Sequence, residues 1–103
     1  MANVNPPKKN QAWSVRASLE DIATPGRFKS SPTLAAGDFK VDIDGGGLNN
    51  LGTLPSVSPA ATKCVLYSLS STEMNGDLIY VLGSDQTTTP EWPDHSIAIQ
   101  TTA

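Results

Sequence analysis

The sequence from Gly37 to Gly47 constrains the fold more than any other part of the chain. Its apolar residues alternate strictly with charged ones, so that Phe39, Val41 and Ile43 share one face. Alternation with a period of two is the pattern of a β-strand that is buried on one face only. The Asp-Gly-Gly sequence that follows favours a tight turn, because glycine adopts the positive φ angles that such turns require. This segment therefore predicts a strand that enters a β-hairpin.

Similar short apolar segments recur along the chain and are separated by turn residues. We expect strands over residues 12–19, 48–54, 63–69, 78–82 and 95–101, and a short edge strand around residues 27–29. Ser70 and Glu73 have the spacing of a capping box, which predicts one short helical turn near residues 71–75. About six or seven short strands at this spacing are typical of an all-β sandwich of two antiparallel sheets.

The composition limits both the domain count and the classes of partner. A chain of 103 residues has room for one domain, and its net charge of −3 comes without a cluster of basic residues. We therefore expect no nucleic-acid partner, since phosphate binding needs clustered Lys and Arg. No apolar segment reaches the length of a membrane span, so no membrane partner is expected either. Cys64 is the only cysteine, which excludes an intrachain disulfide and favours folding in a reducing cytoplasm.

Residues 1–11 are polar, and we expect them to form an extended N-terminal arm ahead of a single domain over residues 12–103. Pro6 and Pro7 favour an extended backbone, and the arm is either a frayed terminus or a tether that orders against a neighbouring subunit. The tether interpretation makes Pro6, Pro7, Lys8 and Lys9 candidate interface residues. Trp92 is a further candidate, because a tryptophan in a loop before a strand either plugs one end of a sandwich or, when exposed, marks an interface.

The aspartates around the glycine turn resemble the start of a calcium-binding loop. An EF-hand loop that begins at Asp42 needs an oxygen ligand at its fifth position and a glutamate at its twelfth. Those positions hold Gly46 and Thr53, so the motif fails. We therefore predict no metal site and expect Asp38, Asp42 and Asp44 to be solvated carboxylates near a turn. The glycines also lack the following Lys and Ser/Thr of a phosphate-binding loop.

The sequence offers no convincing catalytic set. His95 is the only histidine, and its neighbour Asp94 is expected to point to the opposite face of a strand. A nucleophile, its base and the group that orients the base must lie within hydrogen-bond reach. Cys64 lies on an expected core strand, where it acts as a small hydrophobic residue. We predict no catalytic residues and no cofactor, and keep a hydrolytic site built from Asp94, His95 or Cys64 as the alternative.

Four segments of the chain form a distinctive series of turns and caps. They are residues 34–55 (LAAGDFKVDIDGGGLNNLGTLP), 69–77 (LSSTEMNGD), 91–94 (EWPD) and 99–103 (IQTTA). In this series the chain resembles a recurrent module of tailed-bacteriophage and prophage virion proteins. The resemblance covers about two-thirds of the chain, from Leu34 to its end. The chain departs from the module at residues 87–90, where smaller residues are usual, and at Pro93, where a cysteine is expected.

The resemblance implies an Ig-like β-sandwich that serves as a non-enzymatic virion structural protein. Modules of this length look like capsid decoration, head–tail neck or tail-attached proteins, which dock on capsid, portal-neck or tail subunits. They are homo-oligomeric or bound to a repeating lattice, and are made in the host bacterial cytoplasm before they join the virion. The alternative function is a carbohydrate-binding or adhesion module of a phage fibre, which Trp13, Trp92 and the Asp-rich turn suggest.

Overall fold

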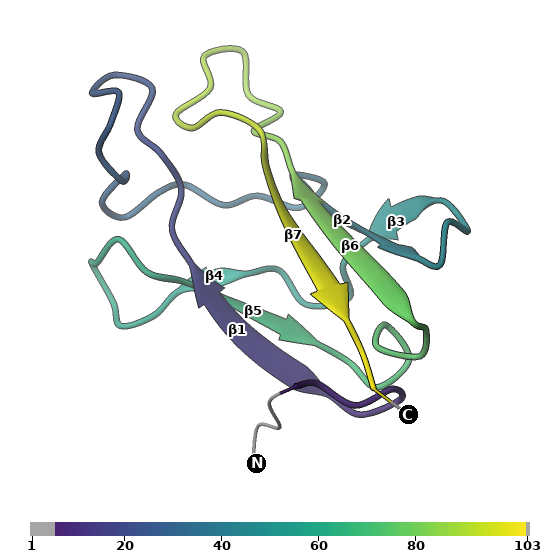
Figure 1. The fold of residues 1–103 in the computed structure, drawn as a ribbon. Helices are drawn as coiled ribbons and strands as arrows, with labels where there is room; N and C mark the ends of the chain where they lie inside the picture. The colour runs from purple at the N-terminus through teal and green to yellow at the C-terminus, as the bar shows by residue number, and fades with distance from the viewer. Residues whose placement is uncertain (1–5, 103) are drawn as a thin grey trace.

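The computed structural model describes residues 6–102, which form two packed antiparallel β-sheets (Figure 1). The strands are β1 (Trp13–Ala17), β2 (Phe39–Ile43), β3 (Leu48–Asn50), β4 (Ser56–Val57), β5 (Val65–Leu69), β6 (Leu78–Gly83) and β7 (His95–Gln100). One sheet has the order β1-β5-β4 and the other the order β3-β2-β6-β7. The predicted all-β sandwich is therefore confirmed.

The strand order corresponds to that of immunoglobulin sandwiches. In that arrangement β1, β5 and β4 take the places of strands B, E and D, while β3, β2, β6 and β7 take those of C′, C, F and G. A strand order of this kind is shared by many unrelated proteins, so it describes a fold and not a function.

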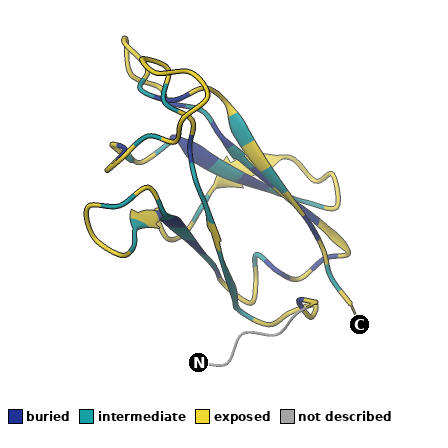
Figure 2. Cartoon of the chain, turned by 60° about the vertical axis from the view of Figure 1, so that its left-hand side comes forward, coloured by how far each residue is buried: buried dark blue, intermediate teal, exposed yellow. Residues whose placement is uncertain are grey.

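The core lies between the two sheets, and alternate residues of each strand face it. On β2 the alternation expected from the sequence is confirmed, because Phe39 and Val41 are buried and Ile43 packs against the same cluster. Exposed residues gather in the loops at both ends of the sandwich (Figure 2). The buried apolar side chains are Leu19, Phe39, Val41, Val65, Tyr67, Leu69, Met74, Ile79, Val81, Trp92 and Ile99.

The hairpin between β2 and β3 forms where the sequence predicts it. Asp44, Gly45 and Gly47 all have positive φ angles, of 54°, 79° and 115°, and two of them are the glycines that tolerate this conformation without strain. The carboxylate of Asp42 accepts hydrogen bonds from the backbone N–H of Gly45 at 3.2 Å and of Gly47 at 2.8 Å. The turn is thus fixed by its glycines and by an acidic side chain of the strand that leads into it.

Residues 70–76 form a hydrogen-bonded turn where the sequence predicts a short helical turn. The capping box is present, since Ser70 N–H donates to Glu73 Oε1 at 2.9 Å and Glu73 N–H donates to Ser70 Oγ at 3.2 Å. No helix follows within the described residues, because Asn75 and Gly76 reverse the chain at once. The predicted single helical turn is present, because Met74 N–H donates to the Ser70 carbonyl four residues earlier at 3.0 Å, and it does not continue into a helix. None of residues 6–102 belongs to a helix long and apolar enough to cross a membrane.

Two further expectations differ from the structure. The segment around residues 27–29 forms a single bridge between Glu20 and Phe28 and no strand. The return strand expected over residues 48–54 ends at Asn50, because Gly52 N–H turns to the carboxylate of Glu73 at 2.9 Å. The short strand β4, which the sequence does not predict, then pairs with β5.

Candidate docking face

The outer face of the four-stranded sheet carries exposed apolar side chains that the core does not need. Strand pairing places Leu48, Asp42, Tyr80 and Ala98 in one row across β3, β2, β6 and β7. Leu48 is 46 % exposed, Tyr80 39 % and the nearby Leu78 61 %. A sandwich requires only the inner face of each sheet to be apolar. We name the outer surface formed by these five residues the docking face.

Strand β6 explains why the sequence does not reveal this face. Its residues are almost all apolar, which predicts a core strand, yet only alternate positions such as Ile79 and Val81 are buried. The intervening Leu78 and Tyr80 point away from the core. The polar Asp42 lies beside Tyr80 on that same side, which is the sequence signal that this face meets solvent.

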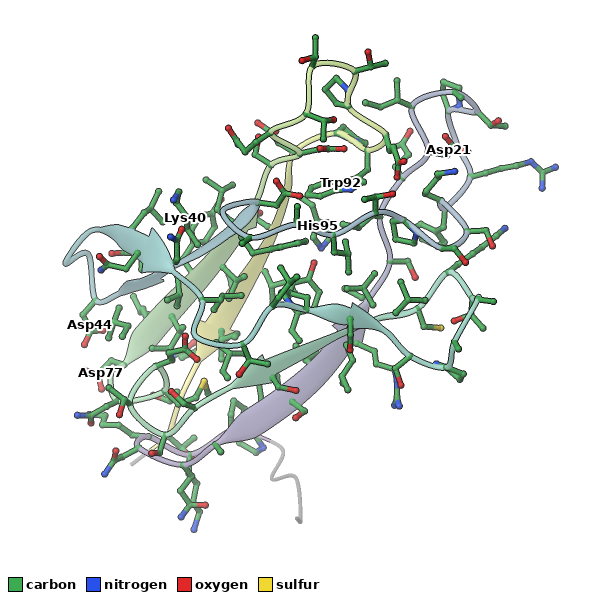
Figure 3. The ribbon with its side chains drawn as sticks, turned by 180° about the vertical axis from the view of Figure 1, so that it is seen from behind. Asp21, Lys40, Asp44, Asp77, Trp92 and His95 are labelled. Carbon is green, nitrogen blue, oxygen red and sulfur yellow. The ribbon has the colours of Figure 1, made fainter. Side chains whose placement is uncertain are left out.

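The docking face is hollowed at one end. A hollow of about 1020 Å³ has an apolar floor that includes Leu78, Tyr80 and Ala98, and an acidic side formed by Asp42, Asp44 and Asp77. Asp44 and Asp77 lie at the same end of the sheet (Figure 3).

One positive charge partly offsets this acidic side. The Lys9 ammonium forms a salt bridge with Asp77, whose hydrogen bond and negative charge raise the pKa of the lysine. The negative charge of Asp44 also raises the pKa of Lys9. Among residues 6–102, Asp42 and Asp44 form no salt bridge, so the rim remains acidic.

The aspartates considered as metal ligands hold backbone amides instead. Asp38 is buried, contrary to the expectation that it is solvated, and accepts hydrogen bonds from Ala35 N–H at 3.1 Å and Gln86 N–H at 3.2 Å. Asp44 Oδ1 accepts from the N–H groups of Asp77 and Leu78, each at 2.9 Å. Within residues 6–102 no three His, Cys, Asp or Glu side chains are grouped so that they could hold a metal ion.

The described part of the N-terminal arm is bound to the domain itself. Thr102 N–H donates to the Pro7 carbonyl at 2.9 Å, and Lys9 N–H donates to the Thr102 carbonyl at 2.8 Å. Pro7 is buried, whereas Pro6, Lys8 and Lys9 are exposed. Residues 1–5 of the expected arm lie outside the described residues. Of the candidate interface residues, Pro6, Lys8 and Lys9 therefore keep surface that a partner could reach.

Trp92 is buried and plugs one end of the sandwich, which is the first of the two roles expected for it. Only 1 % of its surface is exposed, its ring stacks on Phe39, and its Nε1–H donates to the Thr33 carbonyl at 3.4 Å. The assignment of Trp92 as an interface residue is therefore corrected, because the side chain offers no surface to a partner. For the same reason it cannot serve as a stacking platform for a sugar.

The residues of the alternative hydrolytic site are not joined by hydrogen bonds. The Asp94 carboxylate accepts a hydrogen bond from the Ser84 hydroxyl at 2.7 Å. The His95 ring lies between the sheets with its centroid 6.5 Å from that of Tyr67, and burial lowers the pKa of the imidazole. Burial also raises the pKa of Tyr67. The buried Tyr67 Oη and His95 Nε2 have no hydrogen-bond partner in the described part of the chain. Cys64 is a half-buried free thiol.

Comparisons of the chain with models of protein families, with curated proteins and with solved structures find no match.

Proposed function

We propose that the protein is a non-enzymatic structural module that docks on other protein subunits through the docking face. The observation that carries this proposal is the exposure of Leu48, Leu78 and Tyr80 on the outer face of a regular sheet whose inner face already supplies the core. Exposed apolar patches rimmed by polar residues mark interaction sites, because their burial against a partner removes them from water.

The chemistry of the face describes the partner surface. Leu78, Tyr80 and Ala98 require apolar side chains opposite them. Asp42 and Asp44 favour Lys or Arg beside those apolar groups, since opposite charges across an interface direct association and set the register. The expected partner is therefore a protein surface on which apolar side chains are flanked by basic ones.

The finer proposal is that these partner subunits belong to a bacteriophage virion, as capsid, portal-neck or tail proteins. It is supported by the resemblance of residues 34–103 to phage virion modules. The β-sandwich architecture is compatible with a decoration or attachment protein that is made in the host bacterial cytoplasm and carried in the virion. No nucleic acid or membrane enters this proposal.

Two measurements test the two parts separately. Mass spectrometry of purified particles from the phage or prophage that encodes the chain should detect the protein, and its absence from the particles would refute the virion assignment. Binding of the purified chain to particles that lack it then tests the face. Leu78→Asp and Tyr80→Asp should each weaken binding by about 10-fold or more, as expected for residues at the centre of an interface.

Phe28→Asp provides the matched control for these variants. Phe28 is 55 % exposed and lies in the connection between β1 and β2, away from the docking face. The control therefore introduces the same charge at an exposed apolar residue and should bind as the unmodified chain does. Undiminished binding by Leu78→Asp and Tyr80→Asp would refute the docking face and leave the virion assignment standing.

A further inference from the structure

Strand β7 is an edge strand whose outward main-chain groups have no partner among residues 6–102. Thr101 N–H donates to the Asp77 carbonyl at 3.0 Å, and β7 pairs with β6 in the same register. Because main-chain groups alternate in direction along an antiparallel ladder, Ser96, Ala98 and Gln100 point theirs away from β6. Thr102 is next in this alternation, and its outward groups bind the arm segment at Pro7 and Lys9. The free part of the β7 edge therefore ends at Gln100, because the arm covers the edge from Thr102 onward.

The other edges of the two sheets are short or already engaged. β3 spans three residues and β4 spans two. On β1, Trp13 and Ser14 take part in further interactions, and Arg16 places a charged side chain on the edge strand. β7, by contrast, has the sequence HSIAIQ over six residues, with no Lys, Arg, Asp, Glu or Pro. Proteins usually protect long edge strands with such residues, because open edges pair with other strands.

We propose that two copies of the chain pair edge to edge through β7, antiparallel about a two-fold axis that passes by Ala98. In this register Ala98 faces Ala98 of the second copy, and Ser96 faces Gln100. About six main-chain hydrogen bonds form, because each of these facing pairs exchanges two. The two four-stranded sheets then become one continuous sheet, and a two-fold contact of this kind closes on itself.

The residues along the edge favour a second copy as the occupant. The side chains of Ser96, Ala98 and Gln100 are uncharged, so no like charges face each other along the pairing. Beyond Gln100 the arm occupies the edge at Thr102, so the facing strand stops pairing before Asp94, and Asp94 lies beside the arm of the other copy. The exposed Lys8 belongs to this part of the arm, so each end of the interface joins an acidic and a basic side chain. On the inner side, the half-buried Ile97 gains an apolar neighbour in the facing strand.

The pairing also joins the two docking faces. Across the axis the row Asp42, Tyr80 and Ala98 continues directly into the same row of the second copy in reverse order. The pairing uses the strand edge and leaves the docking face open. Its test therefore does not depend on the proposed function.

Ala98→Pro tests the pairing with little expected cost to the monomer. The N–H that proline removes is not used within the described chain, and proline is tolerated on edge strands. Ala98→Val retains the N–H and is the matched control. In sedimentation velocity the full chain and Ala98→Val should have twice the monomer mass at tens of micromolar. Ala98→Pro should raise the dissociation constant by about 10-fold or more, with an unchanged circular dichroism spectrum.

Two further measurements keep the proposal testable if Ala98→Pro does not fold. Ala98→Lys places like charges at the axis and should also give monomers. Lys8→Asp and Asp94→Lys should each weaken the dimer, and the double variant should restore it. In the unmodified chain, amide exchange at Ser96 and Gln100 should become faster on dilution.

Three outcomes would overturn the proposal. The first is a full chain that remains monomeric at about 1 mM. The second is a dimer that persists in a folded Ala98→Pro or Ala98→Lys variant. The third is a dimer that Leu78→Asp dissociates while Ala98→Pro does not, because this would place the contact on the docking face.

Discussion

Trp92 and Phe39 stack at one end of the sandwich, with ring centroids 5.3 Å apart and ring planes 21° apart. Phe39 begins β2, whereas Trp92 belongs to the loop that precedes β7. Gly83, at the end of β6, lies against both rings. Glu91 strengthens the same contact, since its carboxylate accepts hydrogen bonds from the N–H and the hydroxyl of Thr33 at 2.8 and 3.0 Å. This aromatic pair therefore holds the β1–β2 connection, which contains Thr33, and the β6–β7 connection, which contains Trp92, against the four-stranded sheet.

Removal of the Trp92 ring should destabilise the fold strongly. Trp92→Ala is expected to lower the free energy of unfolding by about 3–5 kcal/mol, because it leaves a cavity beside Phe39. Trp92→Phe retains an aromatic ring over Phe39 and should cost less than half as much. Urea unfolding followed by circular dichroism measures both variants. A loss below about 1 kcal/mol for Trp92→Ala would contradict the plug role.

Gly83 is required because the Phe39 ring occupies the space of a side chain. A Cβ atom built at Gly83 would lie 2.8 Å from Phe39 Cε1, which is too close for a real contact. Gly83→Ala should therefore lower the free energy of unfolding by about 1–3 kcal/mol through overpacking. Gly52→Ala is the control, since its Cβ would meet only Glu73 Oε2 at 3.7 Å. Equal stability of the two variants would show that the ring moves freely.

The Gly83 effect should depend on Phe39. In the double variant Gly83→Ala with Phe39→Leu, the smaller side chain leaves room for the new methyl group. The two changes together should then cost less than the sum of the single changes, because residues in contact are not additive. A double-variant cycle in urea measures this coupling.

The features that the sequence predicts are those with local causes. The hairpin after Phe39 follows from alternation and from glycines at positive φ, and both signals lie within one short segment. The capping box is predictable for the same reason, since Ser70 and Glu73 bond to each other. The single helical turn expected there forms, and it does not continue because the chain reverses at Gly76.

The features that the sequence does not predict depend on distant residues. The two residues of β4 are a strand only because β5 pairs with them. Trp92 remains ambiguous in the sequence, because its burial is decided by Phe39 and Gly83. The docking face is also hidden, since an apolar strand such as β6 does not reveal which of its faces the second sheet covers. Strand register, which is a long-range property, supplies that answer.

Asp44 should stabilise the approach of the hairpin to the start of β6. Its Oδ1 accepts two backbone N–H groups, and its φ of 54° lies in the left-handed region that Asp and Asn tolerate better than Ala. Asp44→Ala should lower the free energy of unfolding by about 1–2 kcal/mol. The loss is smaller than for buried hydrogen bonds, because water can replace the lost acceptor at this exposed site. Asp44→Asn keeps an oxygen acceptor and the backbone conformation, so thermal unfolding should place it near the unmodified chain. A larger loss of stability in Asp44→Asn than in Asp44→Ala would contradict the role of Asp44 as a hydrogen-bond acceptor.

His95 should make the fold less stable in mild acid. Burial lowers the pKa of its imidazole below the ordinary value of 6.5, so the folded state holds the ring neutral and the unfolded state binds the proton first. The stabilisation is therefore complete above pH 6.5 and is lost as the pH falls from 6.5 towards the lower pKa of the folded state.

His95→Phe removes this group and should flatten the dependence of stability on pH. Between pH 7 and pH 5 the free energy of unfolding should change more steeply with pH in the unmodified chain than in His95→Phe. The difference between the two slopes is at most about 1.4 kcal/mol per pH unit, which corresponds to the uptake of one proton on unfolding. Because His95 is the only histidine, the carboxylates titrate alike in both proteins and cancel in the difference. Urea unfolding at one fixed protein concentration measures the slopes, and an NMR titration of the imidazole gives its pKa directly. Equal slopes, or a folded-state pKa at or above 6.5, would show that the ring is not held neutral by burial.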